Sequence, residues 1–234
     1  MKLFIFDLET TGLNSQFCGI HQLSGVIAET NGKDIKFLDP FDIKMKPFKG
    51  KRIYQEALEL GDITIDDIDK YQEPQEAYRQ IIALIKKHVN KFNPNDKMFL
   101  VGYNSLHFDN DFLRQWFVDN GDNYFGSYFW SNGIDVMSEA SRVLMNIRPY
   151  MPNFKLGTVA KTLGFEVKED ELHDGLVDVR LTARILIYCL RNPQVKTLDG
   201  YDIGKMVEEC LNYKKEQKEK RKNGNREEKY FIFG

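Results

Sequence analysis

Residues 2–13 read Lys-Leu-Phe-Ile-Phe-Asp-Leu-Glu-Thr-Thr-Gly-Leu, and this stretch decides the fold. Its apolar run is rich in strand-forming residues, which is typical of a short buried strand. Asp7 and Glu9 lie two positions apart at the end of that run. Because successive side chains of a strand alternate between its faces, we expect both carboxylates to point the same way. Two adjacent carboxylates repel each other, and Mg²⁺ or Mn²⁺ accepts such hard oxygen ligands. A strand end that merely meets solvent also often carries acids, so the pair alone does not decide between the two interpretations.

Apolar periodicity on either side of this stretch predicts a mixed sheet flanked by helices. Two further strands are expected, joined at Asn31-Gly32, which is a strong hairpin signal. A helix, another strand and then a helix-rich half follow, whereas residues 41–72 show no clear period. The expected strands are 19–30, 34–40 and 97–103, and the expected helices are 74–91, 109–119, 134–146, 154–163 and 175–191.

Composition excludes several classes of protein. The chain has 234 residues, of which 42% are hydrophobic and 29% charged, enough for a sizeable core. Its net charge of −2 gives no indication of nucleic-acid binding. Three widely separated cysteines predict neither disulfides nor a zinc site, and no phosphate-binding glycine loop is present. With no signal peptide and no long apolar run, we expect a soluble, intracellular, cytoplasmic protein without a membrane partner.

Two later segments also place polar side chains next to regular elements. Asn104 and Asp109 lie between the expected strand 97–103 and the helix that follows it. His173 and Asp178 lie just before and early in the last long helix. Each residue has an ordinary alternative role: Asp109 as a helix cap, Asn104 as a turn residue, Asp178 as a first-turn acid and His173 as a surface histidine. An imidazole near neutral pH can also act as a general base.

Taken together, the three segments resemble the DEDDh 3′–5′ exonucleases, which have the ribonuclease H-like α/β fold. The first segment, 6–13, is similar to that family's opening strand almost letter for letter. Tyr103-Asn104-x-x-x-Phe108-Asp109 is similar to its middle motif, and His173-x-x-x-x-Asp178 to its last. Each motif alone is weak, but their joint order and spacing over about residues 2–190 are specific.

The resemblance implies a two-metal phosphodiesterase. Asp7, Glu9, Asp109 and Asp178 would be the ligands of two Mg²⁺ or Mn²⁺ ions, and His173 would be the general base. The products would be nucleoside 5′-monophosphates, released one at a time from a 3′ end. By the same resemblance, the residues that meet the substrate would be Thr10, Leu13 and Asn104, with core packing as an equal alternative for Leu13.

Within the family, the bacterial exonuclease I group is the most similar, because Gly102-Tyr103-Asn104 replaces the commoner Gly/Ala-His-Asn. This implies nucleic acid as the partner, with single-stranded DNA favoured and RNA possible. Three alternatives stay open. They are a catalytically silent nucleic-acid- or protein-binding module, an RNA-trimming exoribonuclease, and a metal-dependent hydrolase of a small nucleotide.

The C-terminal part has a different composition. We expect an exonuclease domain over residues 1–192 and an extension over 193–234. Residues 214–229 carry eight basic and four acidic side chains, a local charge of +4, and predict a solvated helix or a flexible tail. Such a tail could follow a nucleic-acid backbone or simply keep the protein in solution.

Overall fold

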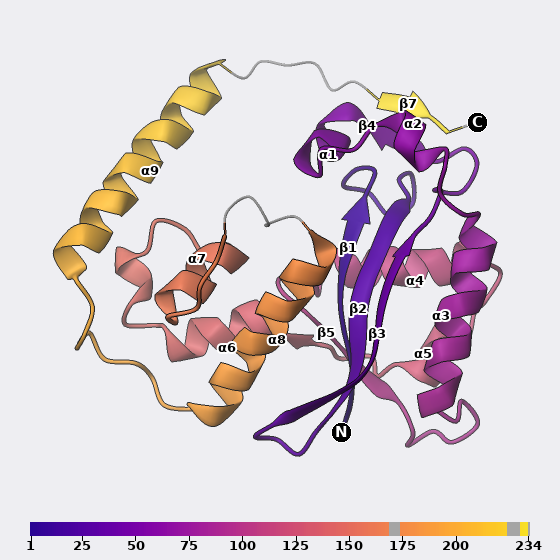
Figure 1. Cartoon of the computed structure of the whole chain (residues 1–234), viewed down its shortest axis with the longest axis horizontal. Helices are drawn as coiled ribbons and strands as arrows, with labels where there is room; N and C mark the ends of the chain where they lie inside the picture. The colour runs from indigo at the N-terminus through magenta and orange to yellow at the C-terminus, as the bar shows by residue number, and fades with distance from the viewer. Residues whose placement is uncertain (169–173, 224–229, 234) are drawn as a thin grey trace.

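The computed structural model describes residues 1–168, 174–223 and 230–233. Its centre is a five-stranded sheet in the order β3-β2-β1-β5-β6 (Figure 1). β1 pairs antiparallel with β2 and parallel with β5, so the sheet is mixed, as the sequence predicts. The strands of this sheet are β1 (Lys2–Thr10), β2 (Ile20–Thr30), β3 (Ile35–Lys44), β5 (Met98–Gly102) and β6 (Ile134–Asp135).

Helices cover both faces of the sheet and give it two cores. The even-numbered β1 residues Phe4 and Phe6 pack in one apolar cluster with side chains of α3, α4 and α5. The odd-numbered Leu3 and Ile5 pack in a second cluster with α6, α7 and α8. The bounds are α3 (Pro74–His88), α4 (Asp109–Asp119), α5 (Phe125–Tyr128), α6 (Val136–Val143), α7 (Leu156–Thr162) and α8 (Gly175–Arg191).

Most of the sequence-predicted elements are confirmed, but the prediction for residues 41–72 is wrong. β3 runs on to Lys44, and three short elements follow: β4 (Arg52–Tyr54), α1 (Gln55–Leu60) and α2 (Ile65–Ile68). They are too short to show a period in the sequence. α2 begins with a capping box, in which Thr64 and Asp67 bond each other's backbone and side chains. These elements close a small third cluster around Ile53, Leu58 and Ile68.

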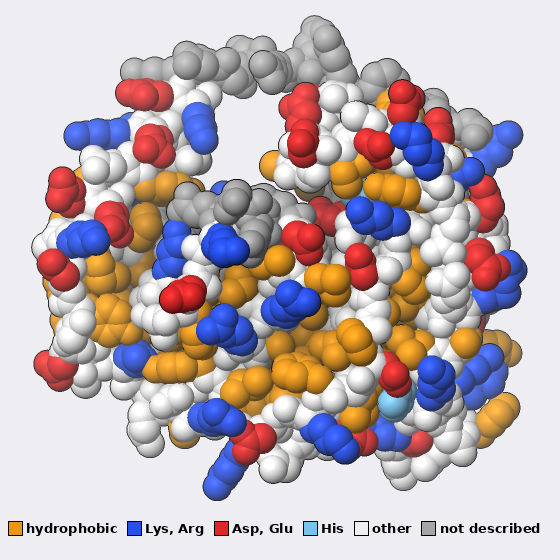
Figure 2. All heavy atoms as spheres, in the orientation of Figure 1, with side chains coloured by type: hydrophobic (Ala, Val, Ile, Leu, Met, Phe, Trp, Pro, Cys, Tyr) orange, Lys and Arg blue, Asp and Glu red, His pale blue; other side chains and the backbone are white. Residues whose placement is uncertain are grey.

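The C-terminal segment contains a long helix, α9, and a short strand, β7. A short 3₁₀ turn, η1 (Arg148–Tyr150), precedes α7, and α9 (Ile203–Asn223) follows α8. The α9 helix contacts η1 and extends away from the sheet (Figure 1). β7 (Tyr230–Ile232) pairs antiparallel with β4. On the face seen in Figure 2, acidic and basic side chains are interspersed, in keeping with the small net charge. The described helices include none that is both long and apolar enough to cross a membrane.

A close approach between Gly175 and Ser24 seats α8 on the sheet. A Cβ at Gly175 would lie 2.4 Å from the Ser24 Oγ and 2.9 Å from its Cβ. Ser24 has little room to move, because it is buried and its hydroxyl donates to Asp42 Oδ1 at 2.8 Å. The absence of a side chain at Gly175 therefore sets how closely the N-terminus of α8 approaches β2.

This contact makes Gly175→Ala an informative variant. Within a helix, Gly→Ala normally stabilises by about 1 kcal/mol, but overpacking a core costs about 1–3 kcal/mol. We expect the free energy of unfolding, measured by urea denaturation, to fall by about 1–3 kcal/mol. Gly126→Ala is the matched control, since a Cβ there would meet nothing within 4 Å. In a double-mutant cycle, Ser24→Gly should recover part of the loss, and strictly additive effects would contradict the contact.

Candidate active site

The carboxyl end of β1 places two carboxylates on the α8 side of the sheet. Asp7 and Glu9 continue the odd-numbered row of Leu3 and Ile5, which faces α8. The cross-strand partner of Asp7 is Ser24, and that of Glu9 is Gln22. Both acids are half-buried. The sequence prediction that they share one face is therefore consistent with the pairing of β1 in the sheet.

Directly after Glu9 the strand pairing is irregular. Thr10 pairs with Ile20 although Glu9 pairs with Gln22, so β2 has one extra residue at this point, His21. Such bulges bend a strand and redirect its side chains. The Thr10 hydroxyl donates to the Gly12 carbonyl at 2.9 Å, which turns the chain away from the sheet. The segment that follows, residues 12–18, is called the β1 loop below.

A tight turn after β5 brings Asp109 to the site. A Cβ at Gly102 would lie 2.6 Å from the Ser105 Cβ, so glycine lets the chain fold back over the strand end. Asn104 adopts a left-handed conformation, with φ of 60°, and its amide donates to Asp135 Oδ1 at 2.8 Å. Asp109 is then the first residue of α4 and is 8% exposed. The N-cap is Phe108 and makes no side-chain bond, so the alternative of Asp109 as a helix cap is wrong.

α8 brings the fourth carboxylate. The Asp174 side chain caps this helix by accepting from the amides of Leu176 and Val177. Asp178 therefore lies one turn into a helix that contacts both β1 and β2, and it is half-buried. His173, which the sequence predicts as the general base, lies outside the described residues.

The four carboxylates form one electrostatic group. Burial, followed by the charges of Asp109, Glu9 and Asp178, raises the pKa of Asp7 well above its ordinary value. Burial and then Asp178 and Asp109 raise the pKa of Glu9 to about 7. Burial raises the pKa of Asp109 to about 7 as well. Because the charges of Asp109 and Asp178 raise the pKa of Asp7 and of Glu9, three segments distant in sequence converge on a single site.

This donor set suits hard divalent cations. Mg²⁺ and Mn²⁺ prefer carboxylate oxygens, and a cation would relieve the repulsion that now favours protonation. In the described part of the chain, no three histidine, cysteine or acidic side chains already form a coordination group.

A cleft of about 300 Å³ lies between the β1 loop and the start of α4. Leu13 lines it and is 87% exposed, so the alternative of core packing for this residue is wrong. Thr10 is buried at the base of the β1 loop, and Asn104 is exposed at the end of β5. The opposite wall of the cleft consists of His107, Phe108, Asp111 and Phe112, of which Phe108 belongs to the sequence motif.

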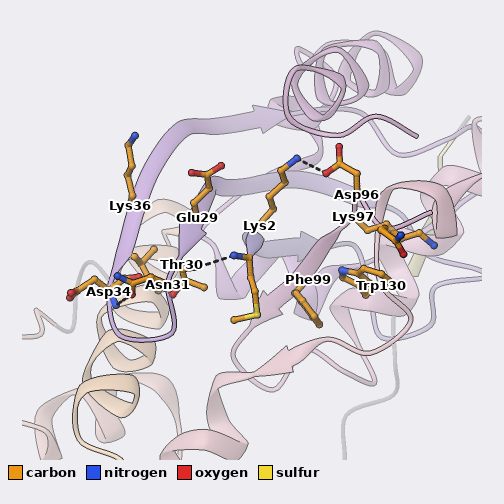
Figure 3. A pocket seen from close by; sticks show the side chains of 13 residues that line it. Lys2, Glu29, Thr30, Asn31, Asp34, Lys36, Asp96, Lys97, Phe99 and Trp130 are labelled. Carbon is orange, nitrogen blue, oxygen red and sulfur yellow. Dashed lines mark hydrogen bonds and ion pairs between the residues drawn. The ribbon is translucent and has the colours of Figure 1, made fainter. Parts of the chain in front are cut away.

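A larger cavity of about 870 Å³ lies at the opposite, amino-terminal end of β1 (Figure 3). Its acids are largely neutralised by neighbouring cations: Lys2 pairs with Asp96, and Arg191 pairs with Asp34. Trp130 forms part of its wall beneath Lys97. Hydrogen bonds from the Asn90 amide and from Lys2 hold the pKa of Asp96 below its ordinary value. Its chemistry is therefore not that of the four-carboxylate site.

Comparison with known proteins agrees with this geometry. Residues 4–186 match the family model RNase_T, described as an exonuclease. No curated protein sequence matches the chain.

Solved structures share the fold at low identity. An E. coli exonuclease I bound to a dT13 oligonucleotide is 19% identical with a TM-score of 0.64, and the match covers 82% of this chain but 41% of the other. The chain thus spans about two fifths of that protein. A 3′-exonuclease that recognises the histone mRNA stem-loop is 21% identical with a TM-score of 0.59, covering 81% of this chain and 63% of the other.

The raised pKa values predict how stability depends on pH. Folded Glu9 and Asp109 hold protons up to about pH 7, whereas the unfolded chain loses them near pH 4. Their contribution to stability is therefore fully present at low pH and is lost as pH rises from about 4 to about 7.

Replacing Asp7 by asparagine removes one repulsive charge. In the absence of divalent ions, we expect Asp7→Asn to raise the melting temperature relative to wild type by a few degrees above about pH 7, and by less near pH 4. Adding Mg²⁺ above pH 7 should stabilise wild type more than the variant. A pH-independent difference between the two proteins would contradict the proposed repulsion.

Proposed function

The chain belongs to the RNase_T exonuclease family, and we propose that it is a metal-dependent 3′–5′ exonuclease of the DEDDh type. The observation that carries this proposal is the convergence of Asp7, Glu9, Asp109 and Asp178, where burial and then the charges of Asp109 and Asp178 raise the pKa of Asp7 and of Glu9. A silent binding module would not need to keep these carboxylates together, since neutralising Asp7 or Glu9 would relieve the repulsion. The boundary of the catalytic domain at residue 192 is part of the same proposal.

In the proposed reaction, water attacks the last phosphodiester. The bond between phosphorus and the 3′ oxygen of the preceding nucleotide breaks, which frees a nucleoside 5′-monophosphate and leaves a new 3′-hydroxyl. Two Mg²⁺ or Mn²⁺ ions, held by the four carboxylates, would stabilise charge on the attacking and leaving oxygens. His173 would take the proton of the attacking water.

The substrate end would lie against the β1 loop. Leu13, exposed on the cleft, offers an apolar contact for the terminal base, and the backbone at Thr10 can bond the 3′-hydroxyl. Asn104 stands exposed at the neighbouring end of β5 and would face the terminal nucleotide. Single-stranded DNA is the favoured substrate, since an oligonucleotide-bound exonuclease I is among the similar structures.

RNA is the second candidate substrate. The match to the histone mRNA 3′-exonuclease covers 63% of that chain, against 41% for exonuclease I. The shared fold with a 3′-exonuclease that recognises an mRNA stem-loop is the observation that favours this candidate.

A digestion panel tests the proposal. With Mg²⁺, a 5′-labelled single strand should give a descending ladder, and a 3′-labelled strand should release labelled mononucleotide at once. Parallel DNA and RNA strands of one sequence decide the substrate class. Fragments from a circular strand would show an endonuclease and overturn the proposal.

His173→Ala serves as the catalytic variant in the same panel. Loss of a general base should lower kcat by about 10²–10⁴-fold with little change in KM. His88→Ala is the matched control, because the His88 imidazole pairs with Asp39 and does not line the cleft. A normal kcat with a raised KM would make His173 a substrate contact instead.

A further inference from the structure

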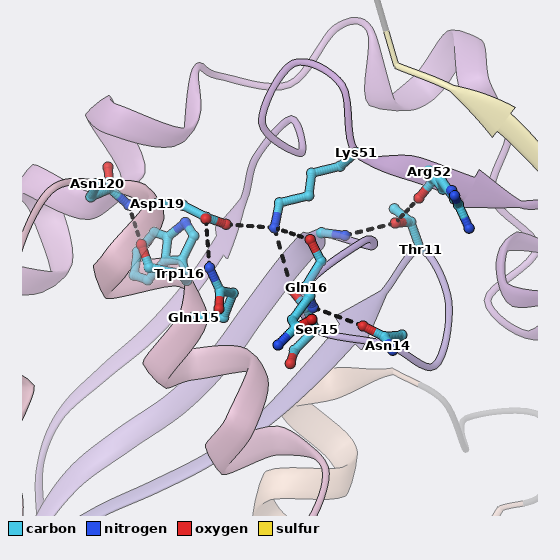
Figure 4. A network of polar contacts seen from close by, with 11 residues as sticks. Thr11, Asn14, Ser15, Gln16, Lys51, Arg52, Gln115, Trp116, Asp119 and Asn120 are labelled. Carbon is cyan, nitrogen blue, oxygen red and sulfur yellow. Dashed lines mark hydrogen bonds and ion pairs between the residues drawn. The ribbon is translucent and has the colours of Figure 1, made fainter.

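Lys51 is a buried cation behind the β1 loop. It is 9% exposed, which is rare for lysine, and oxygen atoms surround its ammonium group. Its Nζ lies 2.8 Å from Asp119 Oδ2 and donates to the Ser15 and Gln16 carbonyls at 3.3 and 3.1 Å (Figure 4). These three acceptors match the three donors of an ammonium group. Lys51 thus joins the middle of the β1 loop to the last turn of α4.

Asp119 occupies an electrostatically unfavourable position without this partner. It ends α4, where the helix dipole places partial negative charge and where an acid is destabilising. No basic residue of α4 offsets it in that turn. Its Oδ1 accepts from Gln115 at 2.8 Å, while Oδ2 meets Lys51. Lys51 therefore compensates for a charge that the helix alone disfavours.

The flanks of the β1 loop are held by the backbone around β4. The Thr11 hydroxyl donates to the Arg52 carbonyl at 2.6 Å, and the Arg52 amide donates to the Phe17 carbonyl at 2.7 Å. Between these anchors, Lys51 contacts the carbonyls of Ser15 and Gln16. Both residues line the cleft that also contains Leu13. Losing the ammonium group would leave one wall of the cleft without its tie to α4.

The opposite wall belongs to the segment that begins α4, which also carries Asp109. Lys51 therefore ties the β1-loop wall of the cleft to the far end of the helix whose first turn forms part of the opposite wall, and it does not line the cleft itself. We propose that Lys51 is a positioning residue that fixes this cleft to accept the base of the terminal nucleotide. The inference rests on the proposed exonuclease function and adds to it how the terminal base is held.

The experiment compares two 3′ ends on otherwise identical strands, one with a normal terminal nucleotide and one with an abasic terminal sugar. Wild type should cleave the normal end more efficiently, because the cleft contacts the base. In Lys51→Met, kcat/KM for the normal end should fall about 10–100-fold, the scale of a misplaced substrate contact. For the abasic end it should barely change. The half-saturating Mg²⁺ concentration should also stay the same, since none of the four carboxylates bonds Lys51.

Lys49→Met is the matched control, because Lys49 lies two residues away and is exposed. If Lys51→Met does not fold, as judged by circular dichroism, Asp119→Asn keeps an acceptor for the ammonium and should give the same loss of base preference in milder form. An equal loss on both ends, or an unchanged preference in a folded variant, would overturn the inference. Absence of activity in wild type would instead count against the proposed function itself.

Discussion

Repulsion among buried carboxylates at the end of β1 is the constraint on which the remaining features of the site depend. Burial makes a charge at Asp7, Glu9 or Asp109 costly, and neighbouring carboxylates increase that cost at Asp7 and Glu9. A fold optimised for stability alone would not assemble such a group. Bound cations would relieve this repulsion, because they would interact with the carboxylate oxygens that the protein leaves poorly solvated.

The carboxylates come together because backbone segments approach each other closely at two glycines. Gly102 lets the turn before α4 fold over the end of β5, and Gly175 lets α8 settle against Ser24. A bulge in β2, opposite the end of β1, interrupts the regular pairing after Glu9. The chain then leaves the sheet and forms one wall of the cleft. Lys51 supports that wall from behind and ties it to the helix that bears Asp109. The chemistry and the substrate contact are thus built on the same few elements.

How much of the structure could be predicted depends on whether the residues responsible for a feature lie close together or far apart in the sequence. The strand with Asp7 and Glu9, the hairpin at Asn31-Gly32 and the cap at Asp174 follow from local patterns, and the structure has each of them. The short elements in residues 41–72 could not be predicted, because a three-residue strand and helices of four and six residues show no clear period and the pairing of β4 with the C-terminal β7 joins segments remote in sequence. Lys51 was missed for a related reason: an isolated lysine gives no sign of being buried.

Calorimetric titration of Mn²⁺ at about pH 7, in two buffers of different ionisation enthalpy, tests the central claim most directly. If the carboxylates hold protons because they repel one another, cation binding must release those protons, and the observed heat will differ between the buffers. The account predicts two ions bound per chain with net proton release, and loss of both in Asp7→Asn. Binding without proton release, or binding that Asp7→Asn leaves intact, would contradict it.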